Sequence, residues 1–398
     1  MSNLESFPSS AHTKRVKFFL FLKVSKMKTK ICPICGSEMK RNGFNSSGRQ
    51  RWRCKGCNKS ETHKRDNTTE RFEEFLNFLF SKQTQMDMKG QGRTFRRRTR
   101  EFWDIWPLPD VVDEIHRVIY VDGIYIKRNL VVLIACSDDH VLSWYLARAE
   151  TSRAWEALLE NIAPPDVVVT DGGTGFGKAV KKLWPNTKIQ RCLFHVFNQV
   201  KRYTTTRPNL ACGVELYSLA KELLHLDNLH QAMWWIERYM QWCEFWCDFL
   251  EEKSLVEGRR EYLHLNLRKA RESLSRLVNQ GTLFTYLDPD LAYEGVLPRT
   301  NNRIEGGINA QLRAMLREHR GMSDIRRIKA VFWWCYMHIE CPKTPSEILT
   351  SMPTDADIDA LYKTYAIGPK REDGGPEWGD RAVWEELHHK TRYPYAID

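Results

Sequence analysis

The chain has 398 residues and a formal net charge of +11, so it exceeds the size that one hydrophobic core usually supports, and we expect two to four structural units. The basic balance favours a polyanionic partner, with nucleic acid as the first candidate, although a ribosomal or RNA-binding protein would share it. No apolar run reaches membrane-spanning length, which predicts no membrane partner.

Residues 1–30 fit no domain pattern and are interpreted as an N-terminal extension, in which Met27 is an alternative first residue. The apolar run at 18–24 is short, is interrupted by Lys23 and has no small-residue cleavage site after it, which argues against a signal peptide. The chain contains eleven cysteines, an odd number. This favours a reducing, cytoplasmic location, at the nucleoid for a DNA-binding protein, over a disulfide framework.

Residues 31–62 contain two Cys-x2-Cys pairs separated by eighteen residues, namely Cys32, Cys35, Cys54 and Cys57. Four thiolates at this spacing make a tetrahedral zinc site in which each pair forms a knuckle. Gly36 and Gly56 suit the tight turns of these knuckles. The segment between the pairs is basic and partly aromatic, so we expect a zinc ribbon that holds Zn²⁺ and also contacts DNA. Its candidate DNA-binding residues are Arg49, Arg51 and Arg53.

Residues 63–106 are expected to form a helical DNA-binding segment. Thr68 or Thr69 can cap a first helix, a short second helix is expected at 83–88, and a basic helix begins near Thr94. This order is compatible with a helix-turn-helix whose last helix enters the major groove, or with a solvated basic helix on a linker. The candidate DNA-binding residues here are Arg96, Arg97, Arg98 and Arg100.

Residues 113–207 change to strands. Apolar runs at 118–126, 130–136 and 141–147 are separated by short polar turns, which predicts antiparallel neighbours. Helices are then expected at 151–162, 174–183 and 193–203, with strands at 167–170 and 189–192 between them. This is the order of a ribonuclease-H-like α/β domain, in which the first and fourth strands are neighbours.

Two aspartates occupy the first and fourth of these strands. Asp122 lies inside the first strand and Asp171 lies just beyond the fourth. A carboxylate is costly to bury unless something compensates its charge, so two on neighbouring strands predict a shared divalent cation. The alternative for Asp171, which precedes two glycines, is an ordinary turn.

An all-helical insertion is expected at 208–295. Four tryptophans lie there at helical spacing, namely Trp234, Trp235, Trp242 and Trp246. Such residues are most often the core of a helix bundle, and stacking on distorted DNA bases is the alternative. Residues 341–398 form a poorly patterned tail that we interpret as an appendage or as partly disordered.

The second part of the core is expected at 296–340 and contributes a third carboxylate. Thr300 or Asn301 can cap a helix that carries Glu305, Asn309 and Leu312 on one face, and a helix at 324–339 packs behind it. The alternative for Glu305 is a solvated helix residue. Glu305 follows Asp171 by 134 residues, which is too far for a minimal ribonuclease-H-like domain, and the insertion accounts for the extra length.

Three such carboxylates suit two-metal phosphoryl transfer, in which acids converge on two cations about 4 Å apart. On this hypothesis Asp122 bridges both cations, Asp171 binds one and Glu305 binds the other. Oxygen ligands of this kind favour Mg²⁺ or Mn²⁺.

Cys192 and His195 form a Cys-x2-His pair after the fifth strand. Without further cysteines the pair is a poor zinc site, so no metal is assigned to it. His195 is a candidate for binding DNA phosphate, and a structural Cys–His pair beside the carboxylates is the alternative.

Four motifs together resemble the DDE transposases of bacterial insertion sequences, in the Mutator-like superfamily. They are Tyr120-Val121-Asp122-Gly123, Thr170-Asp171-Gly172, Cys192-Leu193-Phe194-His195 and Thr300-Asn301-Asn302-Arg303-Ile304-Glu305-Gly306. The resemblance covers about residues 31–340. It implies that Asp122, Asp171 and Glu305 are the catalytic triad of an enzyme that cuts DNA at element ends and joins it to a target.

The resemblance also implies the partners. Terminal inverted repeats and target DNA would be bound as double strands, and the active form would be a homodimer or a higher oligomer. The irregular stretch at 83–92 departs from a regular helix-turn-helix. The competing hypotheses are a regulator that binds DNA without transposing it, a structure-specific nuclease of the same fold, and a zinc-ribbon transcription or RNA-processing factor.

Overall fold

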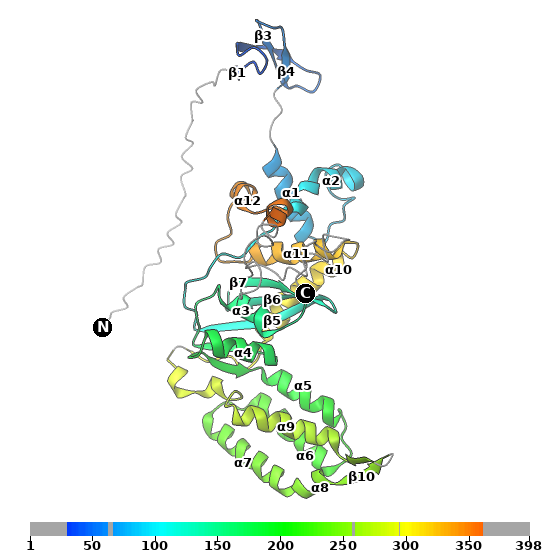
Figure 1. Ribbon diagram of the computed structural model, residues 1–398, viewed down its shortest axis with the longest axis vertical. Coiled ribbons are helices and arrows are strands. Elements are labelled where there is room, and N and C mark those ends of the chain that lie inside the picture. Colours follow the sequence, from blue (N-terminus) through cyan, green and yellow to red (C-terminus); the bar gives the residue numbers. More distant parts are fainter. Residues whose placement is uncertain (1–29, 63–66, 257–258, 294, 361–398) are drawn as a thin grey trace, which may run out of the picture. The chain divides into compact units, whose positions relative to one another are not determined.

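The computed structural model describes residues 30–62, 67–256, 259–293 and 295–360 (Figure 1). It divides into two compact units, Met1–Asn67 and Thr68–Asp398. The N-terminal extension before Lys30 and the tail beyond Ala360 lie outside the described residues. Within the described ranges, no helix is both long enough and apolar enough to cross a membrane.

The described part of the first unit is a four-stranded antiparallel sheet in the order β1-β2-β3-β4. Its strands are β1 (Lys30–Ile31), β2 (Glu38–Phe44), β3 (Gln50–Cys54) and β4 (Ser60–Thr62). Its buried core consists only of Cys32, Met39 and Cys54, with Trp52 packed against them. A core of this size is too small to hold a sheet by apolar burial alone.

One turn residue of this unit differs from the prediction. Gly36 has a φ of 66°, as a tight turn requires, but in the second turn Asn58, with a φ of 57°, has the left-handed conformation and Gly56 does not. Asparagine tolerates this conformation because its short amide can bond to the nearby backbone. Gly56 instead leaves room for the Ser37 hydroxyl, which a Cβ at Gly56 would approach to 3.1 Å.

The second unit is built on a five-stranded sheet in the order β7-β6-β5-β8-β9. The strands are β5 (Val118–Lys127), β6 (Leu130–Cys136), β7 (Val141–Ala147), β8 (Val167–Thr170) and β9 (Lys188–Arg191). The first three pair antiparallel, whereas β8 and β9 run parallel to β5. The expected pairing of the first and fourth strands is confirmed, because residues 118–121 pair with residues 167–170.

Helices cover both faces of this sheet. Alternate residues of a strand face opposite sides, so Ile119 and Val121 of β5 pack against α3 (Ser152–Leu159) and α4 (Thr174–Leu183). Tyr120 and Ile124 lie in the core of the other face, with α5 (Leu193–Thr204) and α11 (Asp324–Met337). The acid-bearing strands are therefore buried between two layers of helices.

The insertion is largely helical, as expected, but it is not all-helical. Its helices are α6 (Ala211–Glu222), η2 (Leu223–His225), α7 (Leu229–Phe245), α8 (Cys247–Glu251), α9 (Leu265–Asn279), η3 (Thr285–Leu287) and η4 (Pro289–Leu291). Between α8 and α9, β10 (Lys253–Val256) and β11 (Arg259–Tyr262) pair as an antiparallel hairpin. Four-residue runs are too short to show a helical or strand period, so the sequence pattern missed this hairpin.

The tryptophans of the insertion divide into two groups. Trp235 and Trp242 are buried in its core, as expected. Trp234 is 54% exposed, and the Arg238 guanidinium lies 4.4 Å from the centroid of its ring.

The segment before the sheet contains α1 (Thr68–Phe80), α2 (Gln91–Thr99) and η1 (Arg100–Asp104). The helices expected near Thr68 and Thr94 are confirmed. The short helix expected at 83–88 is wrong, because these residues form turns. Asp87 accepts hydrogen bonds from the Thr84 amide at 2.7 Å and from its hydroxyl at 2.8 Å, which closes a turn in place of a helix.

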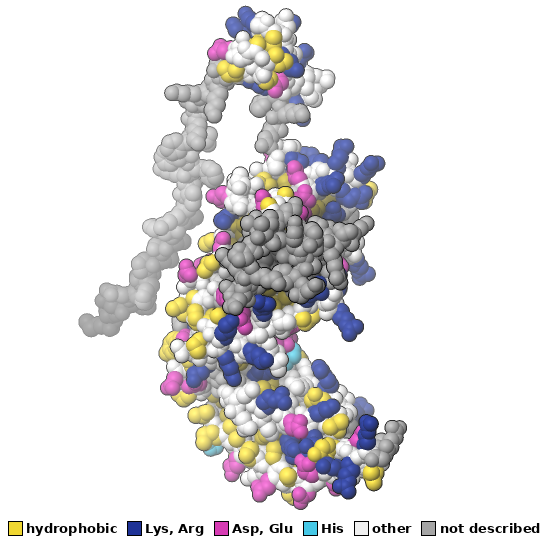
Figure 2. Space-filling view, in the orientation of Figure 1, with side chains coloured by type: hydrophobic (Ala, Val, Ile, Leu, Met, Phe, Trp, Pro, Cys, Tyr) yellow, Lys and Arg dark blue, Asp and Glu magenta, His cyan; other side chains and the backbone are white. Residues whose placement is uncertain are grey.

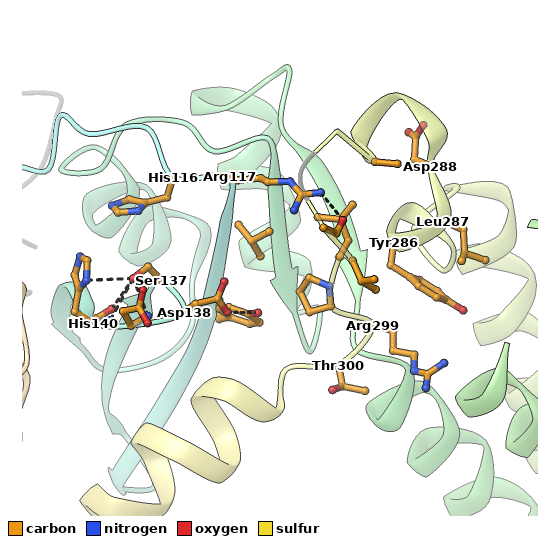
Figure 3. Close-up of a pocket in the computed structure, with 18 of the residues that line it drawn as sticks. His116, Arg117, Ser137, Asp138, His140, Tyr286, Leu287, Asp288, Arg299 and Thr300 are labelled. Carbon is orange, nitrogen blue, oxygen red and sulfur yellow. Dashed lines mark hydrogen bonds between the residues drawn. The ribbon is translucent and has the colours of Figure 1, made fainter. Parts of the chain in front are cut away.

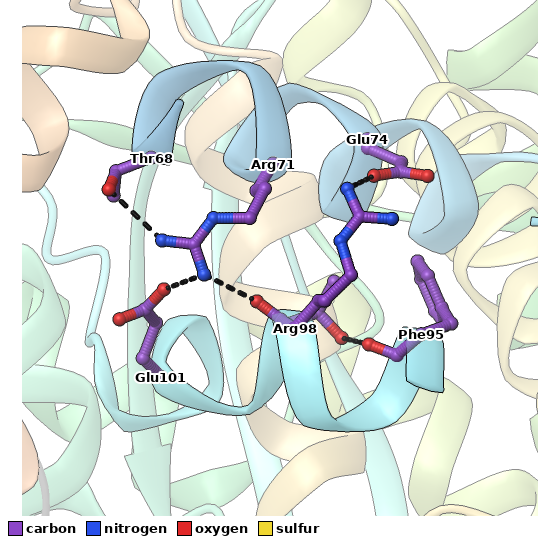
Figure 4. Close-up of polar contacts among 7 residues, drawn as sticks. Thr68, Arg71, Glu74, Phe95, Arg98 and Glu101 are labelled. Carbon is purple, nitrogen blue, oxygen red and sulfur yellow. Dashed lines mark hydrogen bonds and ion pairs between the residues drawn. The ribbon is translucent and has the colours of Figure 1, made fainter. Parts of the chain in front are cut away.

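Two ion pairs join α1 to the elements that follow it, one to α2 and one to η1 (Figure 4). Arg98 Nη2 lies 2.7 Å from Glu74 Oε2. Arg71 Nη1 lies 2.7 Å from Glu101 and donates to the Arg98 carbonyl at 3.1 Å. Arg98, which we expected to bind DNA, therefore joins α1 to α2.

The Glu305 segment begins as a π-helix, η5 (Arg303–Asn309), and continues as α10 (Ala310–Glu318). Neither Thr300 nor Asn301 caps it, because the residue before η5 is Asn302 and it makes no side-chain cap. The expectation of a capped α-helix is therefore wrong. Single-turn π segments occur frequently at functional sites.

The described part of the tail, residues 341–360, packs on the rest of the second unit, and the remainder of the predicted appendage lies outside the described residues. The described part contains α12 (Pro345–Ser351), which begins with a capping box between Thr344 and Glu347. Further along, Asp355 Oδ1 accepts from Trp106 Nε1 at 2.7 Å and from the fully buried Lys329 at 2.6 Å.

Candidate active site

Asp122 and Asp171 come to one edge of the sheet because β5 and β8 are parallel neighbours. Asp122 lies within β5, where its Oδ1 accepts from the Gly123 amide at 2.8 Å. Its Oδ2 accepts from Asn309 Nδ2 at 2.6 Å. Asp171 directly follows Thr170, which pairs with Val121. The two acids therefore leave neighbouring strands at adjacent positions.

The charges of these acids act on one another. Burial raises the pKa of Asp122 to about 7, and repulsion from Asp171 and Glu305 adds to the shift. Burial also raises the pKa of Glu305, which His195 partly offsets. Since three carboxylates from distant segments repel one another here, a cation between them would relieve the repulsion.

The π-helix places Glu305 beside the sheet. Glu305 Oε1 is buried without a hydrogen-bond donor among the described residues. It lies 3.1 Å from Nδ1 of His195. The structure therefore brings together the three predicted acids, with His195 at Glu305.

Among the described residues, two groups of potential metal ligands are compact: within each group the ligand atoms lie within 4.8 Å of one another. One consists of the four cysteines and the other of Cys192, His195 and Glu305. The three acids do not form so tight a cluster. Their wider spacing and their oxygen-only donors fit a pair of hard cations better than a single transition metal.

Two asparagines hold this arrangement, and sequence analysis missed their roles. Asn301 donates from its backbone amide to Cys192 Sγ at 3.2 Å and from its side chain to the Val121 carbonyl at 3.0 Å. Asn309 holds Asp122. Their only signal in the sequence was proximity to Glu305.

The Cys192–His195 pair borders the carboxylates. A hydrogen bond with Cys192 is the main cause that raises the pKa of His195 to about 9, against the effect of burial, and Glu305 adds to it. His195 is therefore cationic at neutral pH. Contact with DNA phosphate stays a prediction.

A fourth acid, Glu150, also lies at the site and was not predicted. It occupies the connection between β7 and α3, and a Cβ on Gly123 would meet its Oε1 at 2.8 Å. Burial and then repulsion by Asp171 raise its pKa. Glu150 belongs to no strand or helix pattern, so sequence analysis could not identify it.

The four cysteines of the first unit form the predicted cluster. Cys32 Sγ lies 3.5 Å from Cys57 Sγ, and Cys35 Sγ lies 3.3 Å from Cys54 Sγ. Backbone amides lower the pKa of Cys32, and hydrogen bonds from Ser37 lower the pKa of Cys35 to about 6. For Cys57, the effect of a hydrogen bond with the Lys59 backbone is outweighed by hydrogen bonding with Cys32 and by burial, which instead raise its pKa to about 12. A tetrahedral metal such as zinc would favour the thiolate form of all four cysteines.

The predicted DNA-binding arginines of the first unit are all exposed, namely Arg49, Arg51 and Arg53. In the second unit Arg96, Arg97 and Arg100 are also exposed, and Figure 2 shows Lys and Arg side chains gathered over α2. Arg98 is partly buried in its ion pair with Glu74. Six of the seven arginines thus remain accessible to a polyanion.

A cavity of the second unit lies outside the group of three acids (Figure 3). Its volume is about 1370 Å³, and His116, Asp138, Tyr286 and Arg299 are among the residues that line it. None of the three predicted catalytic acids contributes to its lining. The cavity therefore does not supply the metal-binding oxygens.

Part of the chain is similar to known proteins. The model of a family described as "Transposase, Mutator family" matches residues 111–252. A probable transposase for an insertion sequence element from Corynebacterium diphtheriae is 24% identical over 131 residues, which cover 28% of this chain and 38% of that protein. A transposase for an insertion sequence element from Lactococcus lactis subsp. lactis is 23% identical over 141 residues, which cover 31% of this chain and 35% of that protein.

The chain thus spans little more than a third of the length of these relatives. The predicted resemblance to Mutator-like transposases of insertion sequences is confirmed. The family match includes Asp122, Asp171, Cys192 and His195, but neither Glu305 nor the four cysteines.

Proposed function

From the resemblance to Mutator-family transposases, we propose that this chain cuts DNA at the ends of an insertion sequence and joins it to target DNA by two-metal phosphoryl transfer. The observation that carries the proposal is the convergence of Asp122, Asp171 and Glu305 from segments far apart in the sequence. A ribonuclease-H-like core, split by the insertion, is part of this proposal.

In this mechanism Asp122, Asp171 and Glu305 would hold two cations, Mg²⁺ or Mn²⁺. Such a pair would supply activation of the attacking oxygen and stabilisation of the leaving oxygen. Asn309 fixes the orientation of Asp122 through its 2.6 Å hydrogen bond. His195 holds Glu305 in position before the cations arrive.

Double-stranded DNA is the proposed substrate, as terminal inverted repeats and as target. The exposed arginines of the cysteine unit and of α2 would bind its phosphates, which predicts an affinity that falls steeply with salt. Zn²⁺ would be the metal of the cysteine unit. A homodimer or higher oligomer would hold two element ends, in the cytoplasm at the nucleoid.

The test is cleavage of a DNA fragment that carries the flanking element end, with Mg²⁺ or with EDTA. Nicking at the element boundary that requires Mg²⁺ and is lost in Asp122→Asn and Glu305→Gln would support the proposal. Glu318→Gln is the matched control for Glu305→Gln, because it makes the same Glu-to-Gln change at an exposed residue of α10. It should cut like the wild type.

Specific binding without cleavage under any metal would instead favour a regulator that binds DNA without transposing it. Cleavage without preference for the element end, and without strand joining, would favour a nuclease of the same fold.

A further inference from the structure

One buried charge at the candidate active site has no partner in the mechanism so far. Arg191, the last residue of β9, is only 8% exposed. Its Nε and Nη1 are enclosed and make no hydrogen bond among the described residues. A buried cation without hydrogen bonds is costly, so proteins rarely keep one unless it serves a ligand.

The backbone of Arg191 is fixed from two directions. Arg191 pairs with Thr170 in the parallel ladder, and its amide donates to the Thr282 carbonyl at 2.8 Å. Gln190 Nε2 donates to the Arg191 carbonyl at 2.6 Å and to the Leu283 carbonyl at 3.0 Å. The insertion segment therefore holds this arginine against the acid-bearing strand.

The guanidinium points to the loop that follows Asp171. Gly172 has a φ of 86°, and a Cβ added to it would lie 0.8 Å from Arg191 Nη1 and 1.8 Å from Cζ. Only glycine leaves space for the guanidinium at this position. This contact gives a physical reason for the glycine directly after Asp171.

Neutralising Asp171 is the simplest structural role for this arginine, and the geometry does not support it. No ion pair within 4.0 Å joins Arg191 to Asp171 among the described residues, although the charge of Asp171 acts on it. Asp171 also has a proposed metal as its counter-ion. Nε and Nη1 are enclosed, but Nη2 is not. Nη2 is therefore the guanidinium nitrogen that an anion can reach.

We propose that Arg191 binds a non-bridging oxygen of the DNA phosphate that is cut at the carboxylate site. This inference rests on the proposed function. Because Nε and Nη1 are enclosed, Nη2 would make this contact as a single charge-assisted hydrogen bond. Donors fixed in advance where negative charge develops stabilise the transition state of phosphoryl transfer.

The test compares two DNA fragments with the element end, one with a normal phosphate and one with a neutral methylphosphonate at the cut position. Binding is measured without added Mg²⁺ or Mn²⁺ and without a chelator, so that no catalytic cation contributes to the difference and the cysteine unit keeps its metal. The wild type should bind the neutral DNA roughly 10-fold or more weakly, as expected for loss of a charged hydrogen bond. Arg191→Gln should bind both fragments with equal affinity, and Arg191→Lys should discriminate weakly.

Cleavage of normal DNA with Mg²⁺ gives a second readout. Arg191→Gln should cut on the order of 100-fold more slowly at saturating DNA. Its thermal unfolding in EDTA should stay at or above that of the wild type, because a buried unpaired charge has been removed. Arg276→Gln, on the exposed surface of α9, is the matched control and should leave both measurements unchanged.

Wild-type discrimination that persists in Arg191→Gln would overturn the inference, even if cleavage is metal-dependent as proposed. If Arg191→Gln fails to fold, equal binding of the two fragments by the wild type would overturn it as well. Absence of any cleavage by the wild type, with discrimination lost in Arg191→Gln, would refute the nuclease activity and keep the phosphate contact.

Discussion

The two candidate metal centres of this chain are built in opposite ways. The four cysteines lie within one short segment, and two of them form most of the buried core of their unit. The three acids come from β5, the residue after β8 and η5, and a large apolar core holds those elements in place. The cysteine ligands are therefore part of the core of their own unit, whereas the three acids are positioned by a hydrophobic core to which they do not belong.

This difference separates the roles of the metals. Where ligands replace a hydrophobic core, metal binding supplies the folding free energy. Where a hydrophobic core positions the ligands before metal binds, as for the three acids, the carboxylates repel one another in the absence of a cation. The free energy of metal binding is then not needed for folding. Removing metal should therefore unfold the first centre, whereas the second should keep its structure.

The largest expected effect is the loss of zinc from the cysteine unit. Cys32→Ser, or treatment with a strong chelator, should remove one zinc per chain and unfold residues 30–62, since little apolar burial remains there. Metal analysis and amide hydrogen exchange would measure this, with the amides of β5–β9 as the internal control. Protected amides at 38–54 in zinc-free protein would contradict the comparison.

The next effect concerns pH in the absence of metal. Asp122 has a folded-state pKa of about 7 against an ordinary value of 3.8, so above pH 4 the unfolded chain releases a proton that the folded chain retains. Stability of the second unit should therefore fall as pH rises from about 4 to 7, by on the order of 4 kcal/mol. Above pH 7 the fall should continue to about pH 9, because the folded chain still retains the proton of His195, whose pKa is raised to about 9.

Denaturant unfolding in EDTA across this range measures the slope. Asp122→Asn should flatten it and should be more stable than the wild type at pH 8, although it loses cleavage. Asp290→Asn, an exposed change on η4, is the matched control and should keep the wild-type slope. An unchanged slope in Asp122→Asn would mean that folding does not raise the pKa of Asp122.

A smaller effect concerns the stability of the second unit, whose core positions the three acids. Lys329 of α11 is fully buried and lies 2.6 Å from Asp355 Oδ1. Asp355→Asn should leave this cation without its carboxylate and destabilise the second unit by about 2–3 kcal/mol, less than a fully enclosed pair because Asp355 is partly exposed. Thermal unfolding that matches the wild type would show that the described tail adds no stability.

The smallest effect concerns the ion pair that joins α1 to α2. A double-mutant cycle on Glu74→Gln and Arg98→Gln should give a coupling of about 1 kcal/mol, because the 2.7 Å pair is only partly buried. DNA affinity should be the same in Glu74→Gln and in the wild type. If Arg98→Gln alone lost DNA affinity and the cycle showed no coupling between Glu74 and Arg98, Arg98 would be a DNA-binding residue, as the sequence predicted.

The sequence predicted what depends on local pattern. Apolar runs and turn lengths gave the strands and the neighbouring positions of Asp122 and Asp171, and spacing alone gave the cysteine cluster. These features depend on residues that are close in sequence, so periodicity and spacing carry the information.

Features that depend on distant contacts could not be predicted. Asn301 bonds to Val121, and Arg191 lies under Gly172, but neither residue interrupts a pattern. Glu150 is one acid among many in a connecting segment. The hairpin β10–β11 is too short for a period, and the π-helix at Glu305 differs from an α-helix only in its hydrogen bonds.

The central claim, that the three acids form the metal site, is tested most directly by mapping where a bound cation lies. With Fe²⁺ in place of Mg²⁺, ascorbate and peroxide generate hydroxyl radicals that cut the polypeptide near the metal. Cuts are expected around residues 122, 171 and 305, and they should disappear in Asp122→Asn and persist in Asp290→Asn. Cuts confined to the neighbourhood of Cys192 and His195, unaffected by Asp122→Asn, would contradict it.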